Sequence, residues 1–160
     1  MKSALLIIDM VNGMEKWIPK KRIKKIVPNI ERLISKARKK NVQIIYAIHK
    51  PLGKNGTKVY NEICPERNDI KIEKNEYSCF YGTDLDKILK KMKIKKLIIT
   101  GISTHWCILA TALDSHYRKY KTVVVSDSIT APDNRKHQLA LEWMKDTINV
   151  SIKSSRYVVL

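Results

Sequence analysis

Three residues far apart in the sequence, Asp9, Lys74 and Cys107, carry side chains that together could form a nucleophilic site. A cysteine thiol attacks carbon best as a thiolate, so it needs a base to remove its proton and a cation to stabilise the charge. Asp9 could be that base, Lys74 the cation and Cys107 the nucleophile. Cys107 also falls near the start of a predicted helix, where unpaired backbone N–H groups would further favour the thiolate.

Each of these residues also has an ordinary structural explanation. A lone cysteine is more often a small buried hydrophobic residue than a nucleophile. Asp9 could only cap a turn, and Lys74 is one of 25 lysines in the chain. Taken one at a time, the three residues do not establish a site.

The elements that would position these residues alternate between strand and helix patterns. Continuous apolar runs such as ALLII are typical of strands buried on both faces, and we predict strands at 4–8, 42–48, 70–74, 96–100, 122–126 and 148–152. Helical periodicity predicts helices at 28–40, 81–92, 104–118 and 131–145. In the second of these, Thr83 and Asp86 have the spacing of a capping box, and in the last, Pro132 lies in the first turn.

This alternation predicts an α/β fold, in which a mostly parallel, Rossmann-like sheet lies between two layers of helices. The length of 160 residues suits one domain spanning residues 1–160. In such folds ligands bind at the carboxyl ends of the strands. The reactive residues at or just beyond those ends are Asp9, His49, Lys74, Cys107 and Asp127.

Composition narrows the function classes. The formal net charge is +17, and the basic residues are mostly lysines spread over several segments. Because base recognition usually uses arginine and stacking aromatic residues, we do not expect nucleic acid as the partner. Three scattered cysteines suggest neither a disulfide framework nor a zinc motif, and no segment resembles a membrane span or secretion signal. We therefore expect a cytoplasmic protein.

Three segments carry a resemblance to a known family: ALLIIDMVNG, KNEYSCFYGTDL and GISTHWCILATALDS. They resemble the aspartate, lysine and nucleophile motifs of the isochorismatase-like cysteine hydrolases, and they occur in that family's order. In the lysine motif, Ser78 and Phe80 follow Lys74 at four and six residues. The resemblance implies the isochorismatase-like hydrolase fold, with Asp9, Lys74 and Cys107 as base, cation and nucleophile.

The resemblance also implies a mechanism. Family members have a cis peptide just after the glycine of the nucleophile motif, which here is the bond between Ile102 and Ser103. The backbone N–H groups of Ser103 and Cys107 would then stabilise an oxyanion. The expected reaction is hydrolysis of a small amide or carbamoyl C–N bond through a thioester on Cys107. Family members are usually homodimers or homotetramers, and we expect the same here.

The substrate pocket is expected near the same edge of the sheet. Candidate substrate-binding residues are Asn12, Trp17, His49, Tyr77, Phe80 and Trp106. Instead of binding substrate, Trp17 and Phe80 could lie in the core or in a subunit contact, and His49 could have a purely structural role. Related nicotinamidases bind a metal through an aspartate and histidines after the second strand. Since His49 stands alone here, we expect no metal and no other cofactor, and do not expect nicotinamide as the substrate.

Two other functions remain open from the sequence. The protein could hydrolyse an isochorismate-like ether, although a cysteine at the nucleophile position favours C–N hydrolysis in this family. It could also be a basic binding module whose thiol is idle.

Overall fold

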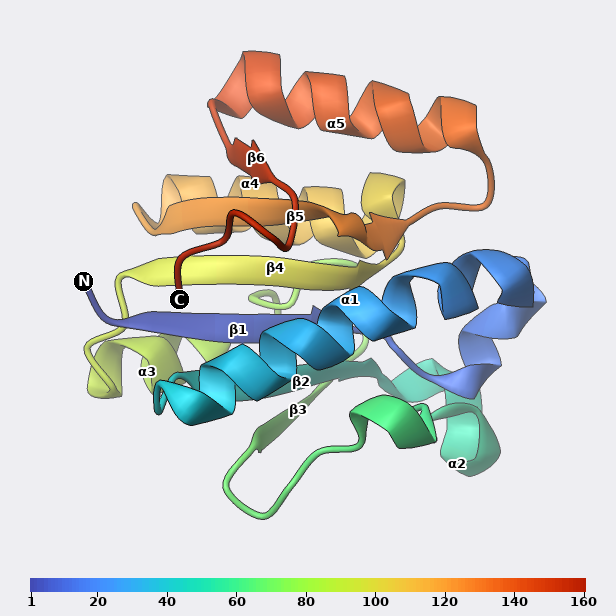
Figure 1. The fold of residues 1–160 in the computed structure, drawn as a ribbon, viewed down its shortest axis with the longest axis horizontal. Helices are drawn as coiled ribbons and strands as arrows, with labels where there is room; N and C mark the ends of the chain where they lie inside the picture. The colour runs from blue at the N-terminus through green and yellow to red at the C-terminus, as the bar shows by residue number, and fades with distance from the viewer.

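The protein, described here from a computed structural model of residues 1–160, is built on a six-stranded parallel sheet (Figure 1). The strand order is β3-β2-β1-β4-β5-β6. The strands are β1 (Ser3–Ile8), β2 (Gln43–His49), β3 (Ile70–Lys74), β4 (Lys96–Ile102), β5 (Lys121–Thr130) and β6 (Ser151–Lys153). The predicted α/β fold with a parallel sheet is confirmed.

Helices cover both faces of the sheet, as Figure 1 shows for α1 (Lys20–Lys39) lying across the front of the strands. On that side Leu5 and Ile7 of β1 belong to the same buried cluster as the apolar side of α1. Leu6 and Ile8 point to the opposite cluster, which includes residues of α3 (Leu85–Lys91), α4 (Leu109–Tyr117) and α5 (Asn134–Ile148). The central strand is apolar at every position after Ser3 because both of its faces are buried.

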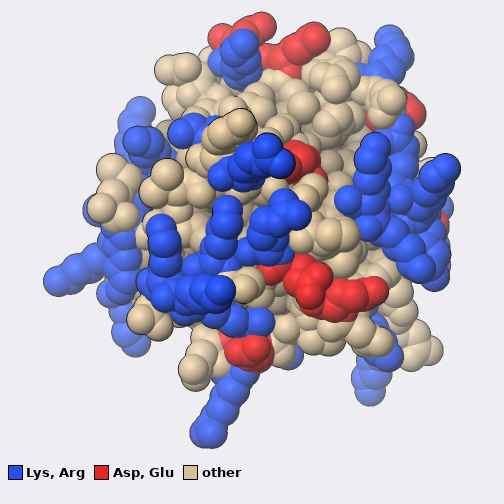
Figure 2. Space-filling model, in the orientation of Figure 1, with Lys and Arg blue, Asp and Glu red and all other residues tan.

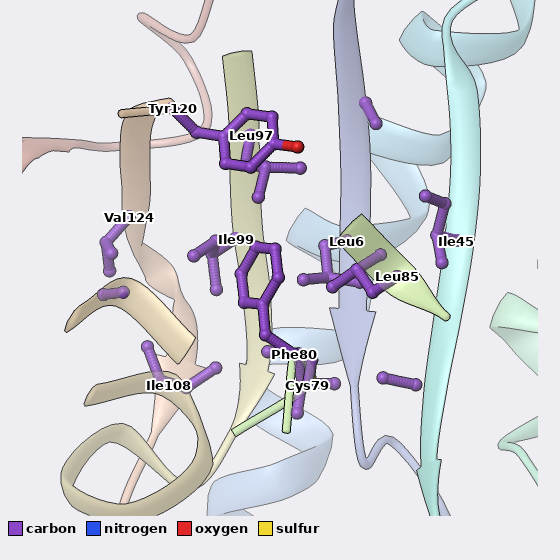
Figure 3. Close-up of a cluster of buried hydrophobic side chains, with 14 of the residues drawn as sticks. Leu6, Ile45, Cys79, Phe80, Leu85, Leu97, Ile99, Ile108, Tyr120 and Val124 are labelled. Carbon is purple, nitrogen blue, oxygen red and sulfur yellow. The ribbon is translucent and has the colours of Figure 1, made fainter. Parts of the chain in front are cut away.

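The second cluster is centred on the segment that follows β3 (Figure 3). Phe80 is 4% exposed and stacks on Tyr120, with 5.9 Å between the ring centres. Leu85, Leu97 and Ile99 lie around it. The loop that carries the lysine motif is therefore tied into the core by its aromatic residue.

Helix α1 begins at Lys20, so the predicted start near residue 28 was wrong. The sequence stretch before Pro28 is helical because Ile23, Ile26 and Val27 continue the buried side of the helix. Pro28 lies inside the helix on its exposed side. The burial of the preceding apolar residues outweighs the helix-breaking tendency of proline at this position.

Two predicted helix starts also differ in detail. The Thr83 hydroxyl accepts a hydrogen bond from Leu85 N at 3.1 Å, but Asp86 bonds Tyr120 and Lys90 and does not complete a capping box. Pro132 precedes α5, which is capped by the Asp133 carboxylate at 2.8 Å from Lys136 N. Asp133 takes the capping position because its side chain can accept that N–H, which leaves Pro132 in the connection.

Lysine and arginine side chains spread over the surface with few acidic neighbours (Figure 2). Helix α1 alone contains nine of them and a single glutamate, Glu31. None of the helices combines the length and apolar character that crossing a membrane requires. All the strands of the sheet point the same way, so their carboxyl ends share one edge.

Candidate active site

Asp9 follows β1 directly and is completely buried. Its backbone lies in the left-handed region, with φ of 51°, which aspartate tolerates better than most residues. Asp9 N donates to Ala47 O at 2.9 Å, and one carboxylate oxygen accepts from His49 N at 2.8 Å. The neighbouring strand β2 therefore fixes both the backbone and the side chain of Asp9.

Lys74 is the last residue of β3, and only 1% of it is exposed. Its ammonium nitrogen lies 2.9 Å from Asp9 Oδ2, 3.3 Å from Cys107 Sγ and 3.0 Å from Glu76 O. The contacts with Cys107 Sγ and Glu76 O are hydrogen bonds, and the contact with Asp9 is a buried ion pair. The structure thus brings together the three side chains that the sequence pattern grouped.

Cys107 lies in a π-helical turn, Thr104–Ile108, between β4 and α4. The turn follows Gly101, at φ of 110°, and a cis peptide bond between Ile102 and Ser103. A Cβ atom on Gly101 would lie 2.1 Å from Ile8 O, so only glycine permits this close approach of β4 to β1. This approach places the turn with the cysteine beside Asp9.

The electrostatics favour an uncharged thiol in the resting protein. Burial raises the pKa of Cys107, the Asp9 carboxylate raises it further, and the Lys74 ammonium only partly opposes this. The helix start does not overcome burial, so the expected resting thiolate is not favoured. Burial alone would lower the pKa of Lys74, but the Asp9 carboxylate together with the sulfurs of Cys107 and Cys79 outweighs burial, so the pKa is raised. Lys74 therefore carries its charge at neutral pH.

A cavity of about 340 Å³ opens beside the sulfur. It is lined by Asp9, Met14, Trp17, His49, Tyr77, Trp106 and Cys107. The rings of Tyr77 and Trp106 are nearly parallel, with centres 6.3 Å apart, and form one apolar wall. Sequence reasoning missed Met14, which lines the cavity from the short 3-10 helix Asn12–Lys16 that follows Asp9.

The structure does not bring every candidate to this cavity. Asn12 is exposed and Phe80 is in the core, and neither lines the cavity. Asp127 accepts hydrogen bonds from the Ser155 backbone and hydroxyl, both at 2.8 Å, which is a structural role. Ile102 and Ser103 are fully buried beneath the nucleophile turn.

His49 lines the cavity with a ring nitrogen, Nδ1, that is buried and has no hydrogen-bond partner. Burial and the nearby Lys74 charge lower the pKa of His49, so the imidazole is neutral at pH 7. No group of three metal-ligating side chains occurs in the chain. The residues around His49 thus do not fit the metal site that the nicotinamidase resemblance would imply.

A buried acid, cation and thiol beside a cavity at the carboxyl edge of a parallel sheet define a small α/β enzyme that acts on a small molecule. The chain belongs to the isochorismatase family, because the pattern of the isochorismatase domain matches residues 3–155. The resemblance seen in the three motifs is therefore confirmed, and the chain is a hydrolase.

Relatives of known sequence include the uncharacterized isochorismatase family protein YaaI of Bacillus subtilis, 29% identical over 98% of this chain and 96% of that protein. A ureidoacrylate amidohydrolase of Methylorubrum extorquens is 39% identical, over 41% of this chain and 27% of its own length.

Among solved structures, N-carbamoylsarcosine amidase from Thermoplasma acidophilum is similar with a TM-score of 0.88 and 28% identity, over 99% of each chain. Nicotinamidase PncA from Bacillus subtilis has a TM-score of 0.86 at 23% identity, over 96% of this chain and all of that one, and shows the shared fold.

Proposed function

We propose that the protein is a metal-independent cysteine amidohydrolase that cleaves a C–N bond of a small amide or carbamoyl compound. The observation that carries the proposal is the contact of one buried ammonium, Lys74, with both the Asp9 carboxylate and the Cys107 sulfur. The names of similar proteins, N-carbamoylsarcosine amidase and ureidoacrylate amidohydrolase, support the same bond type.

The first half of the reaction makes a thioester. Because the resting thiol is neutral, Asp9 takes its proton as the sulfur attacks the carbonyl carbon, and Lys74 stabilises the forming thiolate. The backbone N–H of Cys107, which lines the cavity, donates to the oxyanion of the tetrahedral intermediate. Ser103, the second expected donor, is fully buried and does not line the cavity. The C–N bond then breaks, and Asp9 returns the proton to the leaving nitrogen.

The second half releases the product. Water enters the position of the departed amine and gives a proton to Asp9 as its oxygen attacks the thioester carbonyl. The C–S bond breaks, the sulfur recovers the proton, and the acid leaves. One water is consumed for each amine or ammonia released, and the side chains return to their resting protonation states.

The cavity supports a small, flat substrate. The stacked Tyr77 and Trp106 rings and the half-exposed Trp17 offer apolar contact, as expected for a small-molecule pocket. The neutral His49 imidazole has a free ring nitrogen for a substrate donor or acceptor. Asn12 and Phe80 have no place in this proposal.

The test is ammonia release from a panel of small amides, carbamoyl compounds and ureido acids. We expect turnover by the wild-type protein and by Cys64→Ser, which removes an exposed thiol, and none by Cys107→Ala. Intact-mass measurement after rapid quenching should show the acyl group on Cys107. Full turnover by Cys107→Ala would refute the mechanism.

The same panel separates the other functions. Cleavage of an isochorismate-like ether without ammonia release would indicate an ether hydrolase. A salt-dependent gel shift with random DNA and no turnover would indicate a basic binding module. The expected homodimer or homotetramer and the cytoplasmic location stay predictions, and light scattering measures the former.

A further inference from the structure

We propose that Thr111 and Asp114 on α4 are positioning residues that set where the Lys74 ammonium lies relative to the Cys107 sulfur. The inference rests on the proposed roles of Lys74 and Cys107. Neither Thr111 nor Asp114 lines the cavity, so any effect they have on the thiol passes through the lysine loop, residues 75–80.

The positions of these residues in the sequence favour such a role. Thr111 and Asp114 follow Cys107 at four and seven residues, a spacing that puts side chains on one side of a helix. Cys107 lies in the π-helical turn that runs directly into α4, and Thr111 and Asp114 lie on α4 itself. The turn with the sulfur is therefore continuous with the helix on which the lysine loop docks.

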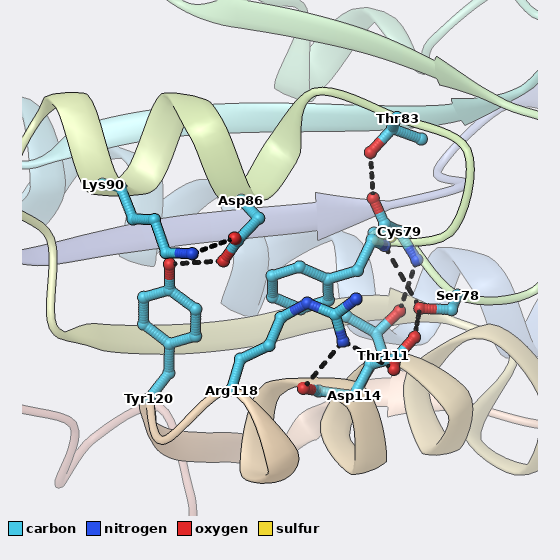
Figure 4. Close-up of polar contacts among 10 residues, drawn as sticks. Ser78, Cys79, Thr83, Asp86, Lys90, Thr111, Asp114, Arg118 and Tyr120 are labelled. Carbon is cyan, nitrogen blue, oxygen red and sulfur yellow. Dashed lines mark hydrogen bonds and ion pairs between the residues drawn. The ribbon is translucent and has the colours of Figure 1, made fainter.

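Two polar contacts dock the lysine loop on that surface (Figure 4). The buried backbone N–H of Cys79 donates to Thr111 Oγ1 at 3.0 Å. The Ser78 hydroxyl donates to an Asp114 carboxylate oxygen and accepts from Phe80 N at 3.1 Å. Thr111 and Cys79 are completely buried, so water cannot replace the first contact.

A third contact ties the same carboxylate to the core. Arg118 Nη1 lies 2.7 Å from the other oxygen of Asp114, and the guanidinium carbon lies 4.8 Å from the centre of the Phe80 ring. Figure 4 shows the Arg118 guanidinium reaching the Asp114 carboxylate. Asp114 therefore holds Ser78 directly and Phe80 through Arg118, and the loop is attached at two nearby residues.

The docked segment reaches the catalytic lysine through one carbonyl. Lys74 Nζ donates to Glu76 O at 3.0 Å, and Glu76 is two residues before Ser78. Between them, Tyr77 stacks on Trp106 in the cavity wall. If the loop is released from α4, the carbonyl that anchors the ammonium is free to shift, and the ammonium then stabilises the thiolate less well.

The experiment measures alkylation of Cys107 by iodoacetamide across pH in a Cys64→Ser background, with Thr111→Val and Thr111→Ser compared. Valine keeps the shape but removes the acceptor for Cys79 N, whereas serine keeps it. Because the rate follows the thiolate fraction, we expect roughly a tenfold slower reaction for Thr111→Val at every pH below the pKa, and a near wild-type rate for Thr111→Ser.

Asp114 supplies a second, independent pair. Asp114→Asn keeps an oxygen that accepts from Ser78, and Asp114→Ala does not. We expect the larger fall in alkylation rate for alanine, even after the rates are corrected for the folded fraction measured by urea titration. A purely structural role would change the folded fraction and leave the corrected rate unchanged.

Lys74→Ala separates the inference from the proposed function. If Lys74→Ala slows alkylation while Thr111→Val and Asp114→Ala do not, the positioning role is wrong and the proposed function stands. Equal slowing by Thr111→Val and Thr111→Ser also overturns it. If Lys74→Ala alkylates at the wild-type rate, the proposed role of Lys74 is itself wrong.

Discussion

At the scale of single residues, the site is a buried ion pair with a neutral thiol in contact. Asp9 is 0% exposed and Lys74 is 1% exposed, so each charge is stabilised mainly by the other. A buried pair of this kind contributes little net stability, but removal of one partner leaves an uncompensated charge. The pair is better explained by the chemistry of Cys107 than by a need for stability.

This explanation predicts that removing one charge of the pair destabilises the protein more than removing both. Asp9→Asn leaves the Lys74 ammonium without its counter-charge and should lower the free energy of unfolding by about 3 to 5 kcal/mol. The double variant Asp9→Asn with Lys74→Met removes both charges and should recover most of that loss. Urea titration monitored by circular dichroism measures both variants.

Activity should not recover with stability. The double variant lacks both the proposed base and the proposed cation, so we expect it to fold and to release no ammonia from the substrate identified for the wild type. A double variant as unstable as Asp9→Asn would show that the pair is needed for folding. An active double variant would contradict the proposed roles of both residues.

At the scale of elements, the contact between β1 and β4 depends on Gly101. The space beside this glycine is occupied by the backbone of Ile8, directly before Asp9. Any side chain there would push β1, which leads to Asp9, away from β4, which leads to Cys107. The close approach of the strands thus positions two of the three reactive groups.

Gly101→Ala should therefore destabilise the protein by more than its positive φ alone explains. We expect a loss of about 3 kcal/mol or more for Gly101→Ala, against about 1 kcal/mol for Gly82→Ala. Gly82 also has a positive φ, at 65°, but no atom lies within 4 Å of the position that a Cβ would take there, so it serves as the control for the backbone contribution. Thermal and urea unfolding measure both, and equal losses would contradict the steric argument.

Helix α1 gives a second prediction at this scale. Pro28 lies inside the helix, on its exposed side, and cannot donate the hydrogen bond that its position offers. Pro28→Ala should raise the free energy of unfolding by about 1 to 3 kcal/mol, because alanine restores the donor and has the best helix propensity. Urea titration measures the change, with exposed Ser35→Ala in the same helix as the control. A destabilised Pro28→Ala would show that the proline is favourable there.

The same helix shows where sequence reasoning succeeds and fails. The inner strands were predictable because short, continuous apolar runs such as ALLII are typical of strands buried on both faces. The last strand, predicted at 148–152, begins only at Ser151, because Ile148 is still part of the buried side of α5. The start of α1 was not predictable, because Pro28 suggests a helix start from the local sequence alone. The helix extends back to Lys20 because Ile23 and Val27 are buried by tertiary packing, which the local sequence does not show. Asp9 and Lys74 were found through their positions at strand ends. Met14 was missed because it lies in a short 3-10 helix beyond the strand end, where neither a strand end nor helical periodicity marks it.

At the scale of the whole molecule, charge is distributed in two ways. The chain carries a net charge of +17, mostly at its surface, while the core keeps several ionisable groups neutral. Burial raises the pKa of Cys79 from 9.0 to about 12, and burial also raises the pKa values of Cys107 and of Tyr46. Repulsion among the surface lysines and arginines lowers the stability of the folded state, and salt screens this repulsion. Salt has much less effect on the buried groups.

The buried groups predict a loss of stability in alkali. A group whose pKa is raised by folding contributes its full stabilisation below its unfolded pKa and loses it as the pH rises toward the folded value. For Cys79 this window begins near pH 9, and between about pH 9 and pH 10 the free energy of unfolding should fall by about 1 kcal/mol from this thiol alone. Urea titrations in about 0.3 M salt, which screens the lysine charges, measure the slope. Cys79→Ala should make the slope less steep, with the remainder coming from the other buried groups, and Cys64→Ser, at an exposed thiol, should not. An unchanged slope in Cys79→Ala would show that this thiol ionises in the folded protein as easily as in the unfolded chain.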